Sequence, residues 1–255
     1  MNKNKIIWIS GASTGIGKAT AIKFIKEGWT IAASSRNQNK LDILKNEVEE
    51  KFGLNKIQIF ICDIREKEQV DRTVSEIEEN IGPIDIALLN AGTAGPNSDD
   101  FKLDHYNYVV KTNISGNLNC IDSVYHVFKK RKKGHISIVA SIVGYRGLPT
   151  SSSYTMSKAA LINLAESMYF DLKKFGVRIS IINPGFIKTS LTNKNTFPMP
   201  FLKSPEYAAV KIYNGLVKSN KFEIMFPFQW ILIIKVLRLL PYKIYFFLVS
   251  KFTNL

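Results

Sequence analysis

Short continuous apolar runs alternate along the chain with longer stretches in which apolar residues recur at every third or fourth position. Six of the runs are rich in β-branched residues and have the length of buried strands, and they cover residues 6–10, 30–34, 57–62, 84–89, 136–140 and 177–182. The stretches between them predict amphipathic helices at residues 16–27, 39–52, 66–80, 103–130 and 154–174. This alternation predicts an α/β fold with a parallel sheet and helices on both faces, because right-handed crossovers carry successive helices over the sheet.

The chain is long enough for one large α/β domain. Its 255 residues are 45% apolar and 22% charged, which is enough apolar material for a sizeable core. No linker or internal repeat divides it, so we predict a single domain over residues 1–255. Residues 190–204 are irregular and contain Pro198 and Pro200 among apolar side chains, and Ser204 is the predicted N-cap of the helix that follows.

Positive charge dominates the composition. Lysine and arginine (35) outnumber aspartate and glutamate (21), which gives a formal net charge of +14 and favours an anionic partner: nucleic acid, a membrane surface or a small molecule. The densest basic run, residues 129–133, lies at the predicted end of a helix before Gly134, where cations suit the helix dipole and glycine suits the cap. Because no nucleic-acid recognition motif is present, we predict no nucleic-acid binding.

Cysteine and histidine are too few and too scattered to indicate a metal site. Cys62 and Cys120 show no CxxC spacing, and His105, His126 and His135 show no HxxxH or HExxH spacing. We therefore expect no metal, and we expect both thiols to pack in the core. The N-terminal residues lack the pattern of a secretory signal peptide, so the expected location is the cytoplasm.

The last segment, residues 226–255, is a hydrophobic and basic appendage. No acid follows Glu223, and Pro241 divides the segment into two predicted helices. Neither half reaches the roughly 18 apolar residues of a membrane span. A basic edge beside a wide apolar face over residues 226–252 fits a helix lying on an anionic membrane surface; it equally fits packing on the core, closure of a pocket or an oligomer interface.

A cluster of glycines stands at the junction of the first predicted strand and the first predicted helix. Gly11, Gly15 and Gly17 have the spacing GxxxGxG and directly follow the strand at residues 6–10. A tight turn needs residues without a Cβ where backbone approaches a pyrophosphate, and the free N–H groups of the helix start bind that anion. The turn therefore predicts a phosphate-binding site.

Further motifs follow this turn, and together they resemble the short-chain dehydrogenase/reductase family. Its signature turn, T/S-G-x-x-x-G-I-G, corresponds to residues 10–17, its N-A-G motif to residues 90–92, and its P-G motif on the nicotinamide side to residues 183–189. The resemblance covers the first four-fifths of the chain. It implies a Rossmann-type doubly wound sheet of seven parallel strands in the order 3-2-1-4-5-6-7, and a homo-oligomer, either a dimer or a tetramer.

The resemblance also implies which residues form the site. The catalytic tetrad is Asn113, Ser141, Tyr154 and Lys158, and Asp63 at the end of the third strand binds the adenine. The residues implied to bind a dinucleotide cofactor are Gly11, Ser13, Thr14, Gly15, Ile16, Gly17, Ser35, Arg36, Asp63, Ile64, Asn90, Ala91, Gly92, Tyr154, Lys158, Pro184, Gly185, Ile187 and Thr189.

The tetrad residues suit carbonyl chemistry. Tyr154 and Lys158 are spaced i, i+4 and so lie one helical turn apart on one face, where positive charge at Lys158 favours the tyrosine phenolate. Tyr154 would protonate the carbonyl oxygen during reduction and take the alcohol proton during oxidation, and Ser141, at the end of a predicted strand, would donate to the same oxygen. By the resemblance, Lys158 also binds the ribose, and Asn113, a poor helix former inside a predicted helix, holds a water that links Lys158 to solvent.

The end of the second predicted strand selects the dinucleotide. NAD-specific sites usually carry an acid there to bind the ribose 2′-OH, whereas an arginine accommodates a 2′-phosphate. This chain has Ser35 in that place, followed by Arg36, so we predict NADP(H) as the cofactor. NAD(H) is the alternative, because Thr14 stands where many NADP-preferring relatives carry a basic residue.

These observations predict an NADP(H)-dependent oxidoreductase that interconverts a carbonyl and a secondary alcohol. The apolar residues at 190–204, which the resemblance makes a mobile lid, favour a small hydrophobic substrate. One alternative is a dinucleotide-sensing or scaffold protein that keeps the fold without turnover, although Tyr154 and Lys158 favour the enzyme. Another is the sugar epimerase and dehydratase branch, which usually has a longer chain and a different glycine spacing.

Overall fold

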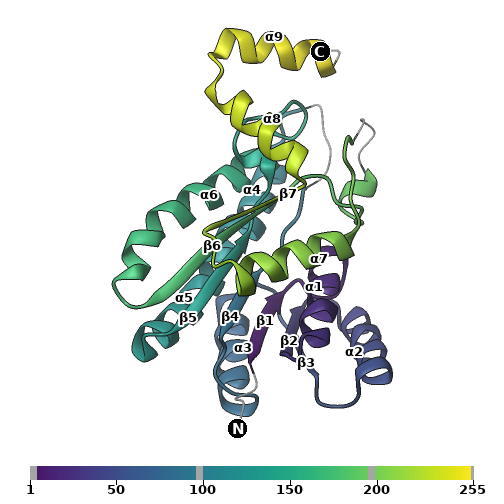
Figure 1. The fold of residues 1–255 in the computed structure, drawn as a ribbon, viewed down its shortest axis with the longest axis vertical. Coiled ribbons are helices and arrows are strands. Elements are labelled where there is room, and N and C mark those ends of the chain that lie inside the picture. Colours follow the sequence, from purple (N-terminus) through teal and green to yellow (C-terminus); the bar gives the residue numbers. More distant parts are fainter. Residues whose placement is uncertain (1–4, 96–99, 195–198, 254–255) are drawn as a thin grey trace.

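The computed structural model describes residues 5–95, 100–194 and 199–253. Within these residues the chain forms one sheet of seven parallel strands with helices on both faces (Figure 1). The strands are β1 (Ile6–Ser10), β2 (Thr30–Ser35), β3 (Ile57–Ile61), β4 (Ile86–Leu89), β5 (Gly134–Val139), β6 (Val177–Pro184) and β7 (Glu223–Phe226). Their order in the sheet is β3-β2-β1-β4-β5-β6-β7, which confirms the predicted fold and strand order.

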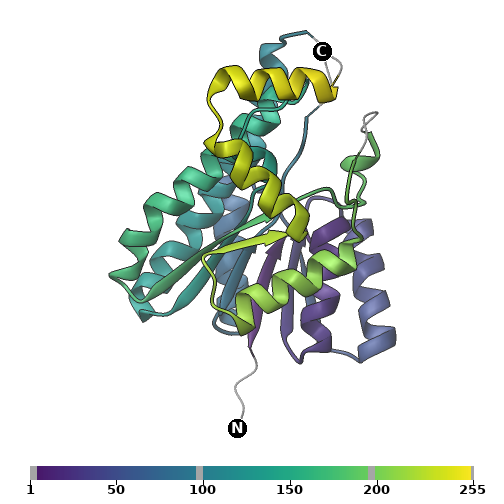
Figure 2. The same cartoon turned by 45° about the horizontal axis from the view of Figure 1, so that its top comes forward.

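Two helical layers cover the sheet. One face carries α1 (Gly15–Lys26), α2 (Gln38–Phe52) and α7 (Pro205–Tyr213); the other carries α3 (Lys67–Asn80), α5 (Gly116–Arg131) and α6 (Ser152–Lys173), with α4 (Leu103–Val109) beside α6 (Figures 1 and 2). Short helical turns lie between these elements: η1 (Val110–Ser115), η2 (Ile142–Gly144), η3 (Thr192–Lys194) and η4 (Asn214–Lys218).

The strands divide the apolar side chains between two cores. Alternate residues of a strand point to opposite faces, so β1 contributes Ile7 and Ile9 to the core under α1 and α2, and Ile6 and Trp8 to the core under α3 and α5. Because both faces are covered, the strands read as continuous apolar runs. The indole of the fully buried Trp8 donates from Nε1 to Ser34 Oγ over 2.9 Å, which satisfies the polar end of this side chain within the core.

The predicted helix at residues 103–130 is continuous but not regular. An α-helical first part, α4, passes into the π-helical turn η1 before α5 begins. A π-helical turn inserts one extra residue into the helix and is frequent at functional sites. The candidate site residue Asn113 lies in this turn.

The seventh strand is an element that the hydrophobic pattern did not locate. β7 has four residues and pairs with β6, with Asn183 opposite Met225. Its last residue, Phe226, is 1% exposed and belongs to the core, although the sequence places it at the start of the appendage. Too few apolar residues stand together here for the pattern to be read as a strand.

Two helices follow β7 at the carboxyl edge of the sheet. These are α8 (Phe228–Leu239) and α9 (Tyr242–Thr253), which confirms the predicted division at Pro241. Among the described residues, no helix has both the length and the apolar character that crossing a membrane requires.

The predicted helix start at Ser204 is also confirmed, since Ser204 Oγ accepts from the Tyr207 N–H at 3.2 Å and caps α7.

The basic run at residues 129–133 ends a helix, as predicted. The guanidinium of Arg131 binds the Glu78 carboxylate at 2.9 Å, and Lys129 lies 4.3 Å from the centre of the Phe175 ring. The cap differs from the prediction, because Lys132 and not Gly134 is the left-handed C-cap, with φ 53° and ψ 32°. Gly134 begins β5, where a Cβ would meet the Phe128 ring at 2.3 Å.

We expect Lys132→Gly to stabilise the protein, because glycine adopts the left-handed conformation without the strain of a Cβ. The free energy of unfolding should rise by about 0.5–1 kcal/mol, measured by urea denaturation. Lys133→Gly is the matched control: it removes the same charge one residue later, where φ is not positive, and should lower stability by about 0.5–1 kcal/mol. Equal effects of the two substitutions would contradict the role given to the backbone at Lys132.

Candidate active site

A cleft of about 440 Å³ opens where β1, β2, β4, β5 and β6 end, at the edge of a parallel sheet that binds ligands in α/β folds. Nearly all of the expected site residues line it: Gly11, Ser13, Thr14, Gly15, Ile16, Ser35, Arg36, Asp63, Ile64, Asn90, Ala91, Gly92, Ser141, Tyr154, Lys158, Pro184, Gly185, Ile187 and Thr189. Gly17 and Asn113 are buried behind the wall of the cleft.

The glycine turn is packed tightly against the end of β4. A Cβ on Gly11 would lie 2.8 Å from the Ala91 Cα, and one on Gly17 would lie 2.3 Å from the Gly11 carbonyl oxygen. The Asn90 amide donates from Nδ2 to the carbonyls of Ser10 (3.2 Å) and Gly11 (3.0 Å). The glycines and Asn90 thus hold the turn in place, and Gly17 serves this packing from behind.

The start of α1 suits an anion. No side chain caps its first turn, and that turn holds no acid, so the N–H groups of the helix start face the cleft with their partial positive charge. Gly15 has φ 55°, and a Cβ there would crowd Thr189 at 3.1 Å. The turn and helix start therefore have the form of a pyrophosphate cradle.

A basic group lies at the end of β2. Ser35, Arg36 and Asn37 line the cleft, together with Lys40, which the sequence analysis missed. Asn37 Oδ1 accepts from the Lys40 N–H at 3.0 Å and caps α2, which puts Lys40 in the first helical turn beside Arg36. Recognising Asn37 as an N-cap would have found Lys40 from the sequence.

Asp63 is held by a neighbouring arginine. The Arg65 Nε donates to both Asp63 carboxylate oxygens at 3.0 Å, and the Arg65 N–H donates to Oδ1 at 3.0 Å. Burial acts to raise the pKa of Asp63, but these bonds outweigh it and hold the pKa below its usual value. Asp63 is therefore an ionised, fixed acceptor at the wall of the cleft.

Lys158 is buried beside Tyr154. Its side chain is 5% exposed, its Nζ donates to the Val139 carbonyl at 2.8 Å, and the Nζ lies 5.5 Å from the centre of the Tyr154 ring. Burial lowers the pKa of Lys158 to about 8, so the ammonium is still mostly charged at pH 7.

The Tyr154 hydroxyl lies in the cleft beside Ser141. Burial raises the pKa of Tyr154 to about 12, and a hydrogen bond with Ser141 acts in the opposite direction. Ser141 is itself oriented by the end of β6, because its hydroxyl donates to the Pro184 carbonyl at 3.4 Å. At neutral pH the protein alone therefore keeps the tyrosine protonated.

Asn113 joins three parts of the site. Its Nδ2 donates to the Thr93 carbonyl (2.8 Å) and to Ser157 Oγ (2.9 Å), and its Oδ1 accepts from the Thr93 N–H (2.8 Å). Its own carbonyl accepts from Asn117 Nδ2 at 2.7 Å. The asparagine side chain thus fixes the segment after β4 to the turn of α6 that carries Tyr154 and Lys158.

The cleft wall formed by the residues after β6 packs against α8. A Cβ on Gly185 would lie 2.6 Å from the Trp230 ring, and Trp230 Nε1 donates to the Pro200 carbonyl at 3.3 Å. The rings of Phe186 and Phe201 contact the same indole edge to face, with centroids 5.6 and 6.2 Å away. Trp230 is not among the predicted site residues, because nothing in the sequence pattern brings α8 to this motif. Residues 195–198 of the predicted lid lie outside the described residues.

The two cysteines are free and buried, which confirms their predicted place in the core. Within the described ranges, no group of three or more histidine, cysteine, aspartate or glutamate side chains is placed to hold a metal ion.

A model of the short chain dehydrogenase family matches residues 5–198. The chain belongs to this family. Its similarity to an uncharacterized oxidoreductase of Myxococcus xanthus is 30% identity over 234 residues, which covers 91% of each chain. It is 31% identical to the 3-oxoacyl-[acyl-carrier-protein] reductase FabG of Thermotoga maritima over 193 residues, covering 75% of this chain and 78% of FabG.

Solved structures show the same arrangement. The structure of ElxO with NADP bound matches this short-chain dehydrogenase with a TM-score of 0.78 and 25% identity, covering 88% of this chain and 98% of ElxO. A tyrosine-to-phenylalanine variant of ElxO with NADPH bound matches with a TM-score of 0.76, at the same identity and coverage. The protein is thus an oxidoreductase of the short-chain dehydrogenase family.

We expect Gly17→Ala to disrupt the turn of this short-chain dehydrogenase, because the added Cβ has no room beside the Gly11 carbonyl. The free energy of unfolding should fall by at least about 2 kcal/mol, and NADPH binding followed by fluorescence should weaken. Gly147→Ala is the control, since nothing lies within 4 Å of a Cβ there and its φ is not positive; its stability should change by less than about 0.5 kcal/mol. If the two variants unfold alike, the close packing at Gly17 is not what the turn requires.

Proposed function

We propose that this chain is an NADP(H)-dependent oxidoreductase that interconverts a carbonyl and a secondary alcohol. The observation that carries the proposal is the common cleft: Ser141, Tyr154 and Lys158 line the same cavity as the glycine turn. A proton donor, its charge partner and a phosphate cradle at opposite ends of one cleft suit hydride transfer at a carbonyl.

The charges at the end of β2 support NADP(H) over NAD(H). Arg36 and Lys40 line the cleft next to the α2 N-terminus, and no acid occupies the position after β2 that would bind a 2′-OH. ElxO, at 25% identity, was solved with NADP. When bound, the dinucleotide supplies or accepts the hydride. Gly11, Gly15 and the α1 start would hold its pyrophosphate, and Asp63 its adenine.

The proton in this mechanism moves through Tyr154. In reduction, the Tyr154 hydroxyl gives its proton to the carbonyl oxygen of the substrate, while the Ser141 hydroxyl donates a hydrogen bond to that same oxygen and stabilises the charge that develops there. The phenolate left behind lies beside the Lys158 ammonium, whose positive charge favours the ionised form of the tyrosine. Asn113 is a positioning residue that fixes the α6 turn through Ser157.

The apolar part of the cleft lining supports an apolar substrate. Leu191 and Ile187 line the cleft, and the exposed Phe201 and Leu202 follow in the described part of the predicted lid. The catalytically silent dinucleotide sensor is the second candidate, and it is disfavoured because Tyr154 and Lys158 are both in place. A homo-oligomer, a cytoplasmic location and contact of residues 226–252 with an anionic membrane stay predictions from the sequence.

Tyr154→Phe should lower kcat by about 10²–10⁴-fold because it removes the proton that the carbonyl oxygen takes up. NADPH binding should persist, as the tyrosine-to-phenylalanine variant of ElxO with NADPH bound suggests. Turnover is followed by nicotinamide absorbance over a panel of ketones, aldehydes, steroids, retinoids and acyl thioesters. Tyr207→Phe, which removes a hydroxyl on α7 outside the cleft, is the control and should keep wild-type rates. Undiminished turnover by Tyr154→Phe would refute the mechanism.

Arg36→Ser should weaken NADPH binding by about 10–100-fold, because a charged hydrogen bond to the 2′-phosphate is lost, and should leave NADH binding unchanged. Titration of each nucleotide against intrinsic fluorescence measures both. Arg72→Ser removes an exposed arginine of α3 and controls for net charge. Tighter binding of NADH than of NADPH by the unmodified protein would reverse the assignment.

A further inference from the structure

The outer faces of α8 and α9 carry large apolar side chains that the chain itself leaves uncovered. Leu239 is 83% exposed and Phe247 is 64% exposed. The exposed apolar residues of these two helices are Phe228, Leu232, Val236, Leu239, Tyr242, Ile244, Phe246 and Phe247, and we call this set the C-terminal apolar face. A contiguous face of this kind marks an interaction site, because soluble proteins rarely leave so many large apolar groups together in water.

The two helices are held in a fixed position on the domain. The Arg146 guanidinium donates from Nε to the Leu237 carbonyl at 3.1 Å and also binds the Leu240 carbonyl, and it stacks on the Tyr242 and Tyr245 rings at 5.0 and 4.6 Å. The buried Tyr245 donates its hydroxyl to the Gly147 carbonyl. Of the C-terminal apolar face, Tyr242 alone takes part in these contacts, and the other side chains of the face stay exposed.

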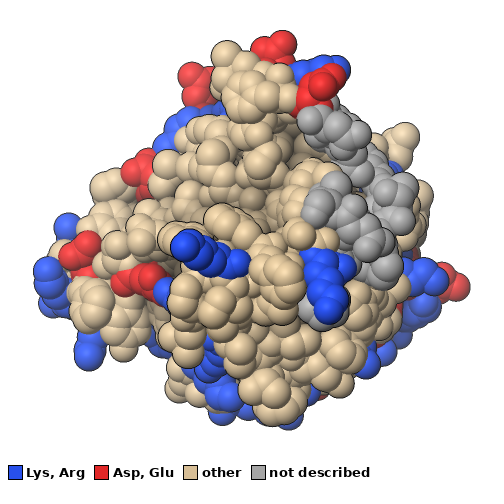
Figure 3. Space-filling view, turned by 90° about the horizontal axis from the view of Figure 1, so that it is seen from above, with Lys and Arg blue, Asp and Glu red and all other residues tan. Residues whose placement is uncertain are grey.

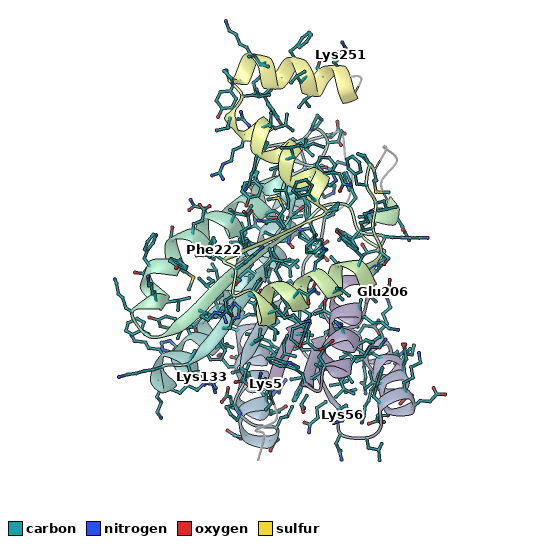
Figure 4. The ribbon with its side chains drawn as sticks, in the orientation of Figure 1. Lys5, Lys56, Lys133, Glu206, Phe222 and Lys251 are labelled. Carbon is teal, nitrogen blue, oxygen red and sulfur yellow. The ribbon has the colours of Figure 1, made fainter. Side chains whose placement is uncertain are left out.

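The charged side chains of the two helices themselves are all basic. After Glu223 the chain contains Lys235, Arg238, Lys243 and Lys251 and no acid. Figure 3, which looks onto this end of the molecule, shows a broad uncharged area with a few basic groups in it and acidic groups toward its edges. Lys251 on α9 lies at the opposite end from Lys5, Lys56 and Lys133, which precede strands at the amino edge of the sheet (Figure 4).

The C-terminal apolar face is joined to the entrance of the cleft. α8 begins two residues after β7 ends, at the carboxyl edge, and its Trp230 packs on Gly185, Phe186 and Phe201. Gly185 lines the cleft. A partner that covers the face therefore lies beside a wall of the cleft that also holds Tyr154.

We infer that the C-terminal apolar face docks on an anionic lipid bilayer and that the substrate is a membrane-dissolved carbonyl or alcohol. α8 and α9, with 12 residues each, are too short to span the hydrocarbon core and so lie in the interface, with apolar side chains inserted and lysines at the headgroups. A second copy of the chain fits less well, because a two-fold contact would bring cations of both copies together without an acid to pair them. The substrate part of this inference rests on the proposed function.

Vesicle co-sedimentation tests the docking without any turnover. The full chain should bind vesicles of phosphatidylcholine mixed with phosphatidylglycerol more strongly than vesicles of phosphatidylcholine alone. The double variant Leu239→Gln, Phe247→Gln should bind at least about tenfold more weakly. The matched control is Ile43→Gln, Phe170→Gln, which removes one aliphatic and one aromatic side chain of 62% and 69% exposure from α2 and α6; its binding should be unchanged.

The charge part of the docking has its own pair of variants. Lys243→Gln, Lys251→Gln should lose the preference for the anionic vesicles, by about fivefold for each lysine, while Lys56→Gln, Lys133→Gln at the far end should keep it. Equal binding by the test and control variants overturns the inference. A second result also overturns it: the wild-type chain does not bind vesicles and forms a dimer in sedimentation equilibrium, and the double variant Leu239→Gln, Phe247→Gln is a monomer. A second copy of the chain is then the partner that covers the face.

A comparison of two ketones separates this inference from the proposed function. The double variant Leu239→Gln, Phe247→Gln should turn over a short water-soluble ketone at the wild-type rate, and should lose at least about tenfold in kcat/KM on a long-chain ketone dissolved in anionic vesicles. Equal losses on both ketones, or on neither, overturn the membrane-dissolved substrate. A wild-type chain that binds vesicles but turns over neither ketone contradicts the proposed function and leaves the docking supported.

Discussion

The site depends on how closely the backbone of the glycine turn approaches the end of β4. Gly17 touches the Gly11 carbonyl, Gly11 touches Ala91, and Asn90 binds the Ser10 and Gly11 carbonyls. This contact uses up polar groups that would otherwise be buried without partners, and it sets the position of α1, whose first N–H groups face the cleft. The position of the predicted phosphate site therefore depends on the packing of the turn against the end of β4 more than on any single residue.

The chemical end of the cleft depends on a second buried polar network. Lys158 loses most of its contact with water, and its pKa falls to about 8. Burial also raises the pKa of Tyr154 to about 12, so the protonation of both side chains is set by their environment. Asn113 ties the turn that carries them to the segment after β4, because one of its side-chain hydrogen bonds goes to Ser157 and two join it to Thr93. The π-helical turn η1 gives this asparagine a place inside an otherwise continuous helix.

The sheet and most of the site could be predicted because they depend on local sequence. Six strands are continuous apolar runs, and the glycine turn, Ser141, Tyr154 and Lys158 stand at strand ends or at helical spacing. The missed features have separate causes, and of these only Trp230 depends on a contact between distant segments. β7 is too short to show a pattern, and Lys132 takes the left-handed cap that glycine was expected to fill. Lys40 and Trp230 reach the site only through the cap at Asn37 and through packing on Gly185.

The packing of Trp230 on Gly185 connects the basic and apolar C-terminal helices to the cleft. Trp230 contacts Gly185, Phe186 and Phe201 together, so a shift of α8 would move the wall of the cleft after β6. Arg146 contacts the other end of α8 and both tyrosines of α9, so the two helices are anchored to the domain at both ends of α8. An apolar surface carried on anchored helices costs less ordering when it is covered, because its backbone is already in place before a partner arrives.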